Sequence, residues 1–97
     1  MEQRKAQRFD LKLPFELIRS GSVAASRSGE TKNVSSSGVL FESDVSLRIG
    51  EPVEYVITLP TSPAPGIQVR LRCMGKVVRL VKETGIAATL ERYEFVR

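Results

Sequence analysis

The chain has 97 residues, a formal net charge of +4 and 41% hydrophobic residues. This length supports one domain with a modest core and leaves no room for a second. The sequence contains no histidine, which excludes Ser-His-Asp and Cys-His nucleophiles and every histidine-containing metal site. Because Cys73 is the single cysteine, an intramolecular disulfide and a four-cysteine zinc site are excluded as well.

The distribution of apolar residues indicates a protein of the reducing cytoplasm. No uninterrupted apolar run exceeds three residues, so we expect no insertion into a membrane. Residues 1–8 are polar and are not followed by the apolar segment of a secretory signal. A single free cysteine also fits a reducing compartment. We therefore expect a cytoplasmic location.

The first half of the chain predicts short extended segments. From Phe9 to Ile18, apolar residues alternate with mostly polar ones, which predicts a strand with one buried face. Pro14 cannot donate to a ladder, so this strand lies at an edge or the nitrogen of Pro14 faces solvent. The small, polar residues 20–29 predict a loop. Further along we expect a short strand at 30–34, a turn-rich run at 33–38 and extended chain at 39–42.

The second half continues the period-two pattern. Residues 47–52 predict a connection that ends in a turn, and 60–66 predict a loop rich in proline. Strands are expected at 53–59, at 67–74 with Arg70 and Arg72 on the outer face, and at 76–81, with a bulge or bend at Gly75. After a turn at 82–85, residues 86–95 favour a last strand, and a short helix over 87–92 is the alternative.

No segment shows a sustained helical stripe, so the chain is expected to be all-β. A small antiparallel barrel is favoured over a sandwich because closure hides the sheet edges of a short chain. Cys73 falls on an inward strand face, where a buried inert thiol is expected rather than a nucleophile. Acidic residues are scattered without paired spacing, so we expect no enzyme, no metal and no cofactor.

Ten of the 15 basic residues are arginine, the side chain suited to bidentate contacts with phosphate and guanine. No acidic residue occurs from Ile67 to Lys82. These charges indicate either an anionic ligand or a solvated strand face. The two basic clusters are Arg4, Lys5, Arg8 and Lys12, and Arg70, Arg72, Lys76, Arg79 and Lys82.

Two local patterns gain meaning from their order in the chain. Arg4 and Arg8 are spaced R-x-x-x-R, and alone they indicate only a basic tail. Asn33, Ser35 and Gly38 are spaced N-x-S-x-x-G, and alone they indicate a turn closed by a side-chain hydrogen bond. Together, on an all-β chain of this size, they resemble the PilZ family of cyclic di-GMP receptors. Further runs that resemble the family are Val39-Leu40-Phe41, Gly50-Glu51-Pro52-Val53, Gly75-Lys76-Val77-Val78-Arg79 and Gly85-Ile86-Ala87.

The resemblance implies a six-stranded barrel with little helix at 9–97, preceded by a flexible, ligand-clasping arm at 1–8. It implies that Arg4, Arg8, Asn33, Ser35 and Gly38 bind cyclic di-GMP. Arginine meets the O6 and N7 edge of guanine, stacks on purines and pairs with phosphate. The expected function is a receptor or adaptor that signals through ordering of the arm and an altered contact with an unidentified downstream protein.

Two departures from the family keep alternatives open. Gln3 stands where many members carry a further arginine, so the number of ligands bound per site stays open. Many members also end in a helix over the barrel, whereas here Tyr93, Phe95 and Val96 either fill that place as a strand or pack against a partner. The alternatives are a domain that has lost ligand binding and mediates assembly, and a nucleic-acid-binding barrel. The second is disfavoured because most aromatic residues fall on predicted inward faces.

Overall fold

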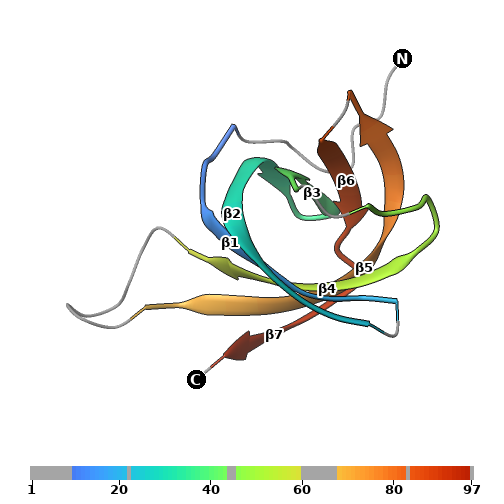
Figure 1. Cartoon of the computed structure of the whole chain (residues 1–97). Helices are drawn as coiled ribbons and strands as arrows, with labels where there is room; N and C mark the ends of the chain where they lie inside the picture. Colours follow the sequence, from blue (N-terminus) through green and yellow to red (C-terminus); the bar gives the residue numbers. More distant parts are fainter. Residues whose placement is uncertain (1–9, 22, 44–45, 60–67, 83, 97) are drawn as a thin grey trace, which may run out of the picture.

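The computed structural model describes residues 10–21, 23–43, 46–59, 68–82 and 84–96, and within them it contains strands and turns but no helix (Figure 1). None of these segments forms a helix long and apolar enough to cross a membrane. The strands are β1 (Pro14–Ser20), β2 (Val23–Ser35), β3 (Gly38–Glu42), β4 (Pro52–Thr58), β5 (Arg70–Val81), β6 (Gly85–Thr89) and β7 (Arg92–Val96).

Six of the described strands close into an antiparallel barrel. They follow one another in the order β4-β1-β2-β3-β6-β5, and β4 pairs with β5 to complete the ring. The ribbon in Figure 1 curls round into a ring for this reason. β7 lies outside the ring and pairs with the first half of β5. The prediction of a small, all-β, six-stranded barrel is therefore confirmed.

Three aromatic rings fill the centre of the barrel. The ring of Phe15 stacks on the ring of Phe41, with centroids 4.2 Å apart, and lies 5.4 Å from the ring of Tyr55. The Tyr55 hydroxyl donates a hydrogen bond of 2.9 Å to the carbonyl of Thr89. Burial raises the pKa of the Tyr55 phenol far above its ordinary value, so this hydroxyl stays protonated and keeps the hydrogen bond.

The first predicted strand begins later than the sequence pattern suggested. β1 starts at Pro14, and the prediction for Phe9 falls outside the described residues. Leu13, Phe15 and Leu17 are buried as expected, but Leu11 is 41% exposed. β1 is a central strand, between β2 and β4. Its proline is tolerated because it is the first residue of the strand and pairs only with β2.

The loop predicted at 20–29 is wrong. The chain turns at Gly21, whose φ of +60° suits a glycine, and β2 then runs from Val23 to Ser35. Residues in this stretch pair in register with β1, for example Arg27 with Leu17. Small and polar residues have low strand propensity, but the neighbouring strand supplies a ladder that overrides it.

The predicted irregularity at Gly75 is displaced along the strand. Gly75 pairs in regular register with Val53 of β4, so no bulge occurs there. The register shift on the β6 side lies between Val77 and Arg79. Gly75 is instead needed for close packing, because a Cβ at this position would lie 1.8 Å from the carbonyl oxygen of Thr89.

The extended structure favoured at 86–95 is confirmed, but it forms two strands rather than one. Residues 85–89 form β6, which pairs with β3, and residues 92–96 form β7. At the break, the Leu90 amide donates to the Ser37 carbonyl, and the Glu91 amide donates to the Met74 carbonyl. The expectation that the aromatic residues are buried on inward faces is wrong for Tyr93 and Phe95, which are exposed because β7 lies outside the closed ring.

Candidate ligand-binding site

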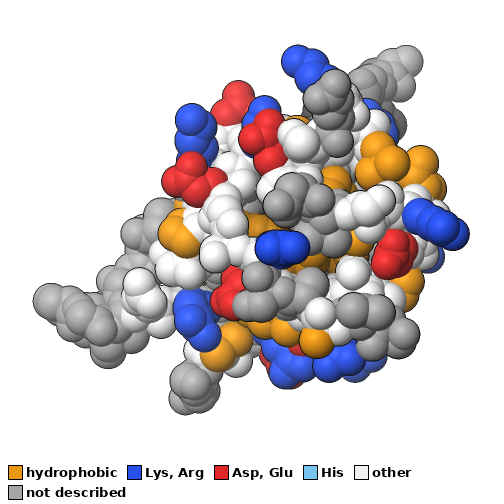
Figure 2. Space-filling view, in the orientation of Figure 1, with side chains coloured by type: hydrophobic (Ala, Val, Ile, Leu, Met, Phe, Trp, Pro, Cys, Tyr) orange, Lys and Arg blue, Asp and Glu red, His pale blue; other side chains and the backbone are white. Residues whose placement is uncertain are grey.

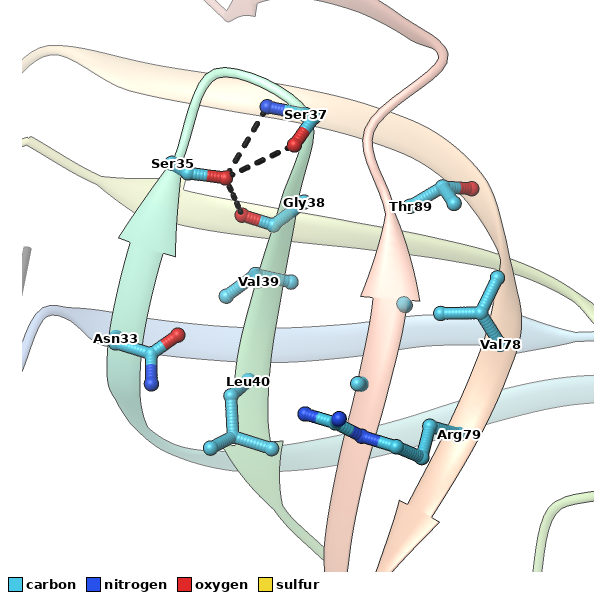
Figure 3. Close-up of a pocket in the computed structure, with 11 residues that line it drawn as sticks. Asn33, Ser35, Ser37, Gly38, Val39, Leu40, Val78, Arg79 and Thr89 are labelled. Atoms are coloured by element: carbon cyan, nitrogen blue, oxygen red, sulfur yellow. Dashed lines mark hydrogen bonds between the residues drawn. The ribbon is translucent and has the colours of Figure 1, made fainter. Parts of the chain in front are cut away.

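A shallow hollow of about 220 Å³ lies on the outside of the barrel, across β2, β3, β6 and β5 (Figure 3). It brings together segments from both halves of the sequence. The Asn-x-Ser-x-x-Gly run forms one side, and β5 forms the other. Its lining residues are Asn33, Ser35, Ser37, Gly38, Val39, Leu40, Val78, Arg79, Ala87, Ala88 and Thr89.

Asn33 reaches the hollow because β2 is irregular just before it. The register between β2 and β3 shifts between Thr31 and Asn33. Thr31 is buried, and its Oγ1 accepts a 2.9 Å hydrogen bond from the Leu13 amide and donates one of 2.7 Å to the Leu11 carbonyl. Asn33 is half-buried and lies on the β2 side of the hollow (Figure 3). One threonine therefore fixes both the start of the motif and the chain that leads into β1.

Ser35 closes the turn between β2 and β3. Its Oγ accepts a 3.2 Å hydrogen bond from the Ser37 amide and donates one of 3.4 Å to the Gly38 carbonyl. The Oγ atoms of Ser35 and Ser37 also lie 3.2 Å apart (Figure 3). The predicted turn closed by a side-chain hydrogen bond is thus present, with serine rather than asparagine closing it.

Gly38 is required by the approach of β6. A Cβ on Gly38 would lie 2.5 Å from the carbonyl oxygen of Ala88, closer than atoms normally come. Its φ is not positive, so packing and not backbone conformation selects the glycine. The close approach draws β3 against β6, and the two strands together form the floor of the hollow.

Arg79 is the cation of the hollow. The register shift after Val77 leaves both Val78 and Arg79 on the exposed surface of β5. Arg79 lies opposite Ala87, whose small side chain lets the arginine extend across β6 toward Leu40 (Figure 3). Within the part of the chain that the structure describes, Arg79 makes no ion pair. Its guanidinium is therefore available to an anionic or guanine-like ligand.

The other basic residues of β5 are partly neutralised by neighbouring strands. Glu54 on β4 forms a charge-assisted hydrogen bond with Arg72, and this bond raises the pKa of the guanidinium. Glu94 on β7 lies 3.7 Å from Arg72, and Glu91 lies 3.9 Å from Lys76. Acidic and basic side chains are accordingly interspersed on the surface in Figure 2. The basic run from residue 67 to 82 is not one continuous cationic face.

The structure brings together three of the five predicted site residues. Asn33, Ser35 and Gly38 line one hollow, whereas Arg4 and Arg8 fall outside the described residues. The sequence prediction missed Arg79 as a site residue, although it lies in one of the family-like runs. Cys73 is buried as expected, and burial raises its pKa to about 11, so its thiol is inert at neutral pH.

The comparison with protein families agrees with this arrangement. A search of curated proteins found no match. The family model of the PilZ domain matches residues 2–96, which is nearly the whole chain. The matched range includes both short motifs and every strand of the barrel. A closed barrel with the Asn-x-Ser-x-x-Gly turn on its outer wall and a match of this extent lead to one conclusion: the chain belongs to the PilZ domain family, the family of cyclic di-GMP receptor domains.

Proposed function

We propose that this chain is a non-enzymatic, cytoplasmic receptor that binds cyclic di-GMP in the hollow between β2 and β5. The observation that carries the proposal is the position of Arg79, an unpaired cation among the described residues, in the same hollow as Asn33. A guanidinium meets the O6 and N7 acceptors of guanine or the oxygens of a phosphate. The amide of Asn33 offers both a donor and an acceptor to a base edge.

The small size of the hollow indicates that a second part of the chain also contacts the ligand. Its volume of about 220 Å³ is below the roughly 300–1,000 Å³ of typical small-molecule pockets. A ligand with two guanines and two phosphates extends beyond such a hollow. We therefore assign the remaining contacts to Arg4 and Arg8 in the arm at residues 1–8, which folds over the ligand.

The attachment of the chain at Leu11 supports this role of the arm. Thr31 holds the Leu11 carbonyl and the Leu13 amide, and Thr31 precedes Asn33 by two residues. Arg8 is three residues from this anchor, a span of at most roughly 10 Å of extended chain. Ordering of the arm on bound ligand would then change the surface offered to a downstream protein.

A role in protein assembly is the second candidate function. The observation that favours it is the exposed pair of Tyr93 and Phe95 on β7, since aromatic residues are enriched at interfaces. Gln3, in place of a further arginine, is compatible with weaker ligand binding. Nucleic-acid binding is disfavoured because Arg72 and Lys76 are engaged by carboxylates.

Calorimetry with cyclic di-GMP tests the ligand. The wild-type chain is expected to bind it in preference to GTP, GMP and cyclic di-AMP, because adenine presents a donor where guanine presents O6. Arg79→Ala should weaken binding about ten- to a hundred-fold, the value of one lost charge-assisted contact. Arg70→Ala, which removes an arginine of the same strand outside the hollow, should leave the affinity unchanged. No heat and no thermal shift at near-millimolar cyclic di-GMP would exclude the receptor role.

Amide hydrogen exchange tests the arm. Residues 2–9 are expected to exchange more slowly when cyclic di-GMP is bound, because ligand contacts offset the roughly 1–2 kcal/mol per residue that ordering costs. Arg8→Ala should remove this protection and weaken binding, with no change in the melting temperature. Equal exchange of residues 2–9 with and without ligand would rule out signalling through the arm even if binding itself were observed.

A further inference from the structure

β7 extends the sheet beyond the closed barrel. On one side it pairs with residues 70–74 of β5, whose opposite side is already occupied by β4. Among the described strands, none pairs with the other side of β7. A barrel removes exposed strand edges, so this strand restores the edge that the fold otherwise avoids. Its free backbone groups can accept another strand.

One face of β7 is aromatic. The side chains of Tyr93 and Phe95 are 60% and 61% exposed, and their rings form an edge-to-face pair with centroids 6.4 Å apart. They lie opposite Cys73 and Leu71 of β5, and therefore on the face of the sheet that carries the barrel core. Figure 2 shows hydrophobic surface near the end of the described chain. Two adjacent exposed rings on a free edge are typical of an interface.

The other face of β7 carries one charge of each sign. Arg92 and Glu94 alternate with the aromatic residues, so they share the opposite face of the strand. Glu94 also lies 3.7 Å from Arg72 of β5. A cation and an anion two residues apart on an edge strand make that strand complementary to an antiparallel copy of itself.

We propose that β7 pairs with β7 of a second copy of this chain, around a two-fold axis that passes next to Tyr93. In this register Arg92 lies opposite the partner's Glu94, and Glu94 lies opposite the partner's Arg92. Tyr93 then faces the partner's Tyr93, and each Phe95 lies diagonally across from a tyrosine. Opposite charges and aromatic residues placed directly across a ladder are both stabilising.

The registers centred on Arg92, Glu94 and Phe95 lack this complementarity. An axis at Arg92 sets two guanidinium groups directly against each other, and an axis at Glu94 does the same with two carboxylates; like charges placed opposite one another are destabilising. An axis at Phe95 sets Glu94 against Val96 and leaves Arg92 without an acidic residue opposite it. Residues directly opposite each other in a ladder lie on the same face of the sheet. An axis between two residues of β7 would pair an aromatic residue with a charged residue of the other face, so the axis must pass next to a residue. The sequence of β7 therefore selects both the partner, a second copy, and the register.

Such an interface is small. A strand of five residues with two rings per copy is well below the roughly 800 Å² per partner of a standard interface. We expect a reversible dimer with a dissociation constant of roughly micromolar to millimolar. The two copies would form one continuous sheet through β4, β5 and β7 of each.

Sedimentation velocity over a range of protein concentrations tests the dimer. The wild-type chain is expected to shift from monomer to dimer as concentration rises. Arg92→Glu and Glu94→Arg should each raise the dissociation constant roughly tenfold or more, because each sets like charges across the axis. An equimolar mixture of the two variants should dimerise again, since every pair across the axis then has opposite signs.

Three outcomes would overturn the proposal: a wild-type chain that stays monomeric at near-millimolar concentration, an Arg92→Glu variant that dimerises normally, or a mixture that stays monomeric. Melting curves of both charge variants test whether the fold is retained.

Oxidation of the Tyr93→Cys variant gives an independent readout, because the new thiol should form a disulfide with the same thiol of the second copy. The control variant is Ile49→Cys, at a similarly exposed turn position, and it should form no covalent dimer. The native Cys73 is buried and should not react in either variant. Equal rates of covalent dimer formation would contradict the assigned axis.

Discussion

Phe41→Ala is expected to lower the free energy of unfolding by about 3–5 kcal/mol, as for other large buried aromatic residues. Phe41 is 0% exposed and stacks on Phe15 at the centre of the barrel. It lies in β3, between β2 and β6, so the cavity would touch strands from both halves of the chain. Since the free energy of unfolding of a small domain is about 5–15 kcal/mol in total, this variant should be only marginally folded at 25 °C. Urea unfolding followed by circular dichroism measures the loss.

Phe95→Ala is the matched control for this prediction. The same side chain is deleted, but from a position that is 61% exposed. This variant should lower the free energy of unfolding by no more than about 1 kcal/mol, because little surface is buried there and no cavity forms. The comparison is made at low protein concentration, where β7 does not associate. Equal losses for the two variants would mean that the barrel centre does not supply the main stabilisation.

Gly75→Ala is the second substitution with a large expected effect, a loss of about 1–3 kcal/mol from overpacking. The added Cβ would lie 1.8 Å from the Thr89 carbonyl oxygen and 2.6 Å from its carbon. These are backbone atoms, so β6 itself must move. The same carbonyl accepts the hydrogen bond from Tyr55, and Thr89 lines the hollow. We therefore expect weaker cyclic di-GMP binding as well as a lower melting temperature.

Gly29→Ala separates this packing effect from the loss of a glycine as such. A Cβ on Gly29 would lie 3.8 Å from the nearest atom, the Glu42 carbonyl oxygen, which is an ordinary contact. The variant should change stability by no more than about 0.5 kcal/mol, or raise it slightly because the unfolded chain loses freedom. Thermal melts of both variants decide the matter. If Gly29→Ala proved as costly as Gly75→Ala, the contact with Thr89 would not be the cause.

The period-two pattern was sufficient to predict most of the barrel. Val53, Tyr55 and Ile57 are buried as their alternation indicated, and so are Phe15 and Leu17. Burial of one sheet face imposes this pattern directly on the sequence, so it can be read without a structure. The stretch at 20–29 could not be predicted, because its strand is set by pairing with β1 and not by its own residues.

The candidate site was only partly predictable for a related reason. Asn33, Ser35 and Gly38 are close in sequence, so their turn was visible as a motif. Arg79 joins them through the pairing of β3 with β6 and of β6 with β5, together with a register shift that no local signal marks. Likewise, the carboxylates that engage Arg72 come from β4 and β7, far from it in sequence.

The closure of the barrel also sets how fast the chain can reach its native state. The hairpins β1–β2, β2–β3 and β5–β6 join neighbouring strands, but the ring is complete only when Phe15 reaches Ile57 and Gly38 reaches Thr89. These distant pairings cost chain entropy before they return any contact energy. All-β domains of this kind fold in roughly milliseconds to seconds, whereas helical bundles take microseconds to milliseconds. During that interval the unclosed hairpins expose their edges, which makes self-association most hazardous before the barrel has formed.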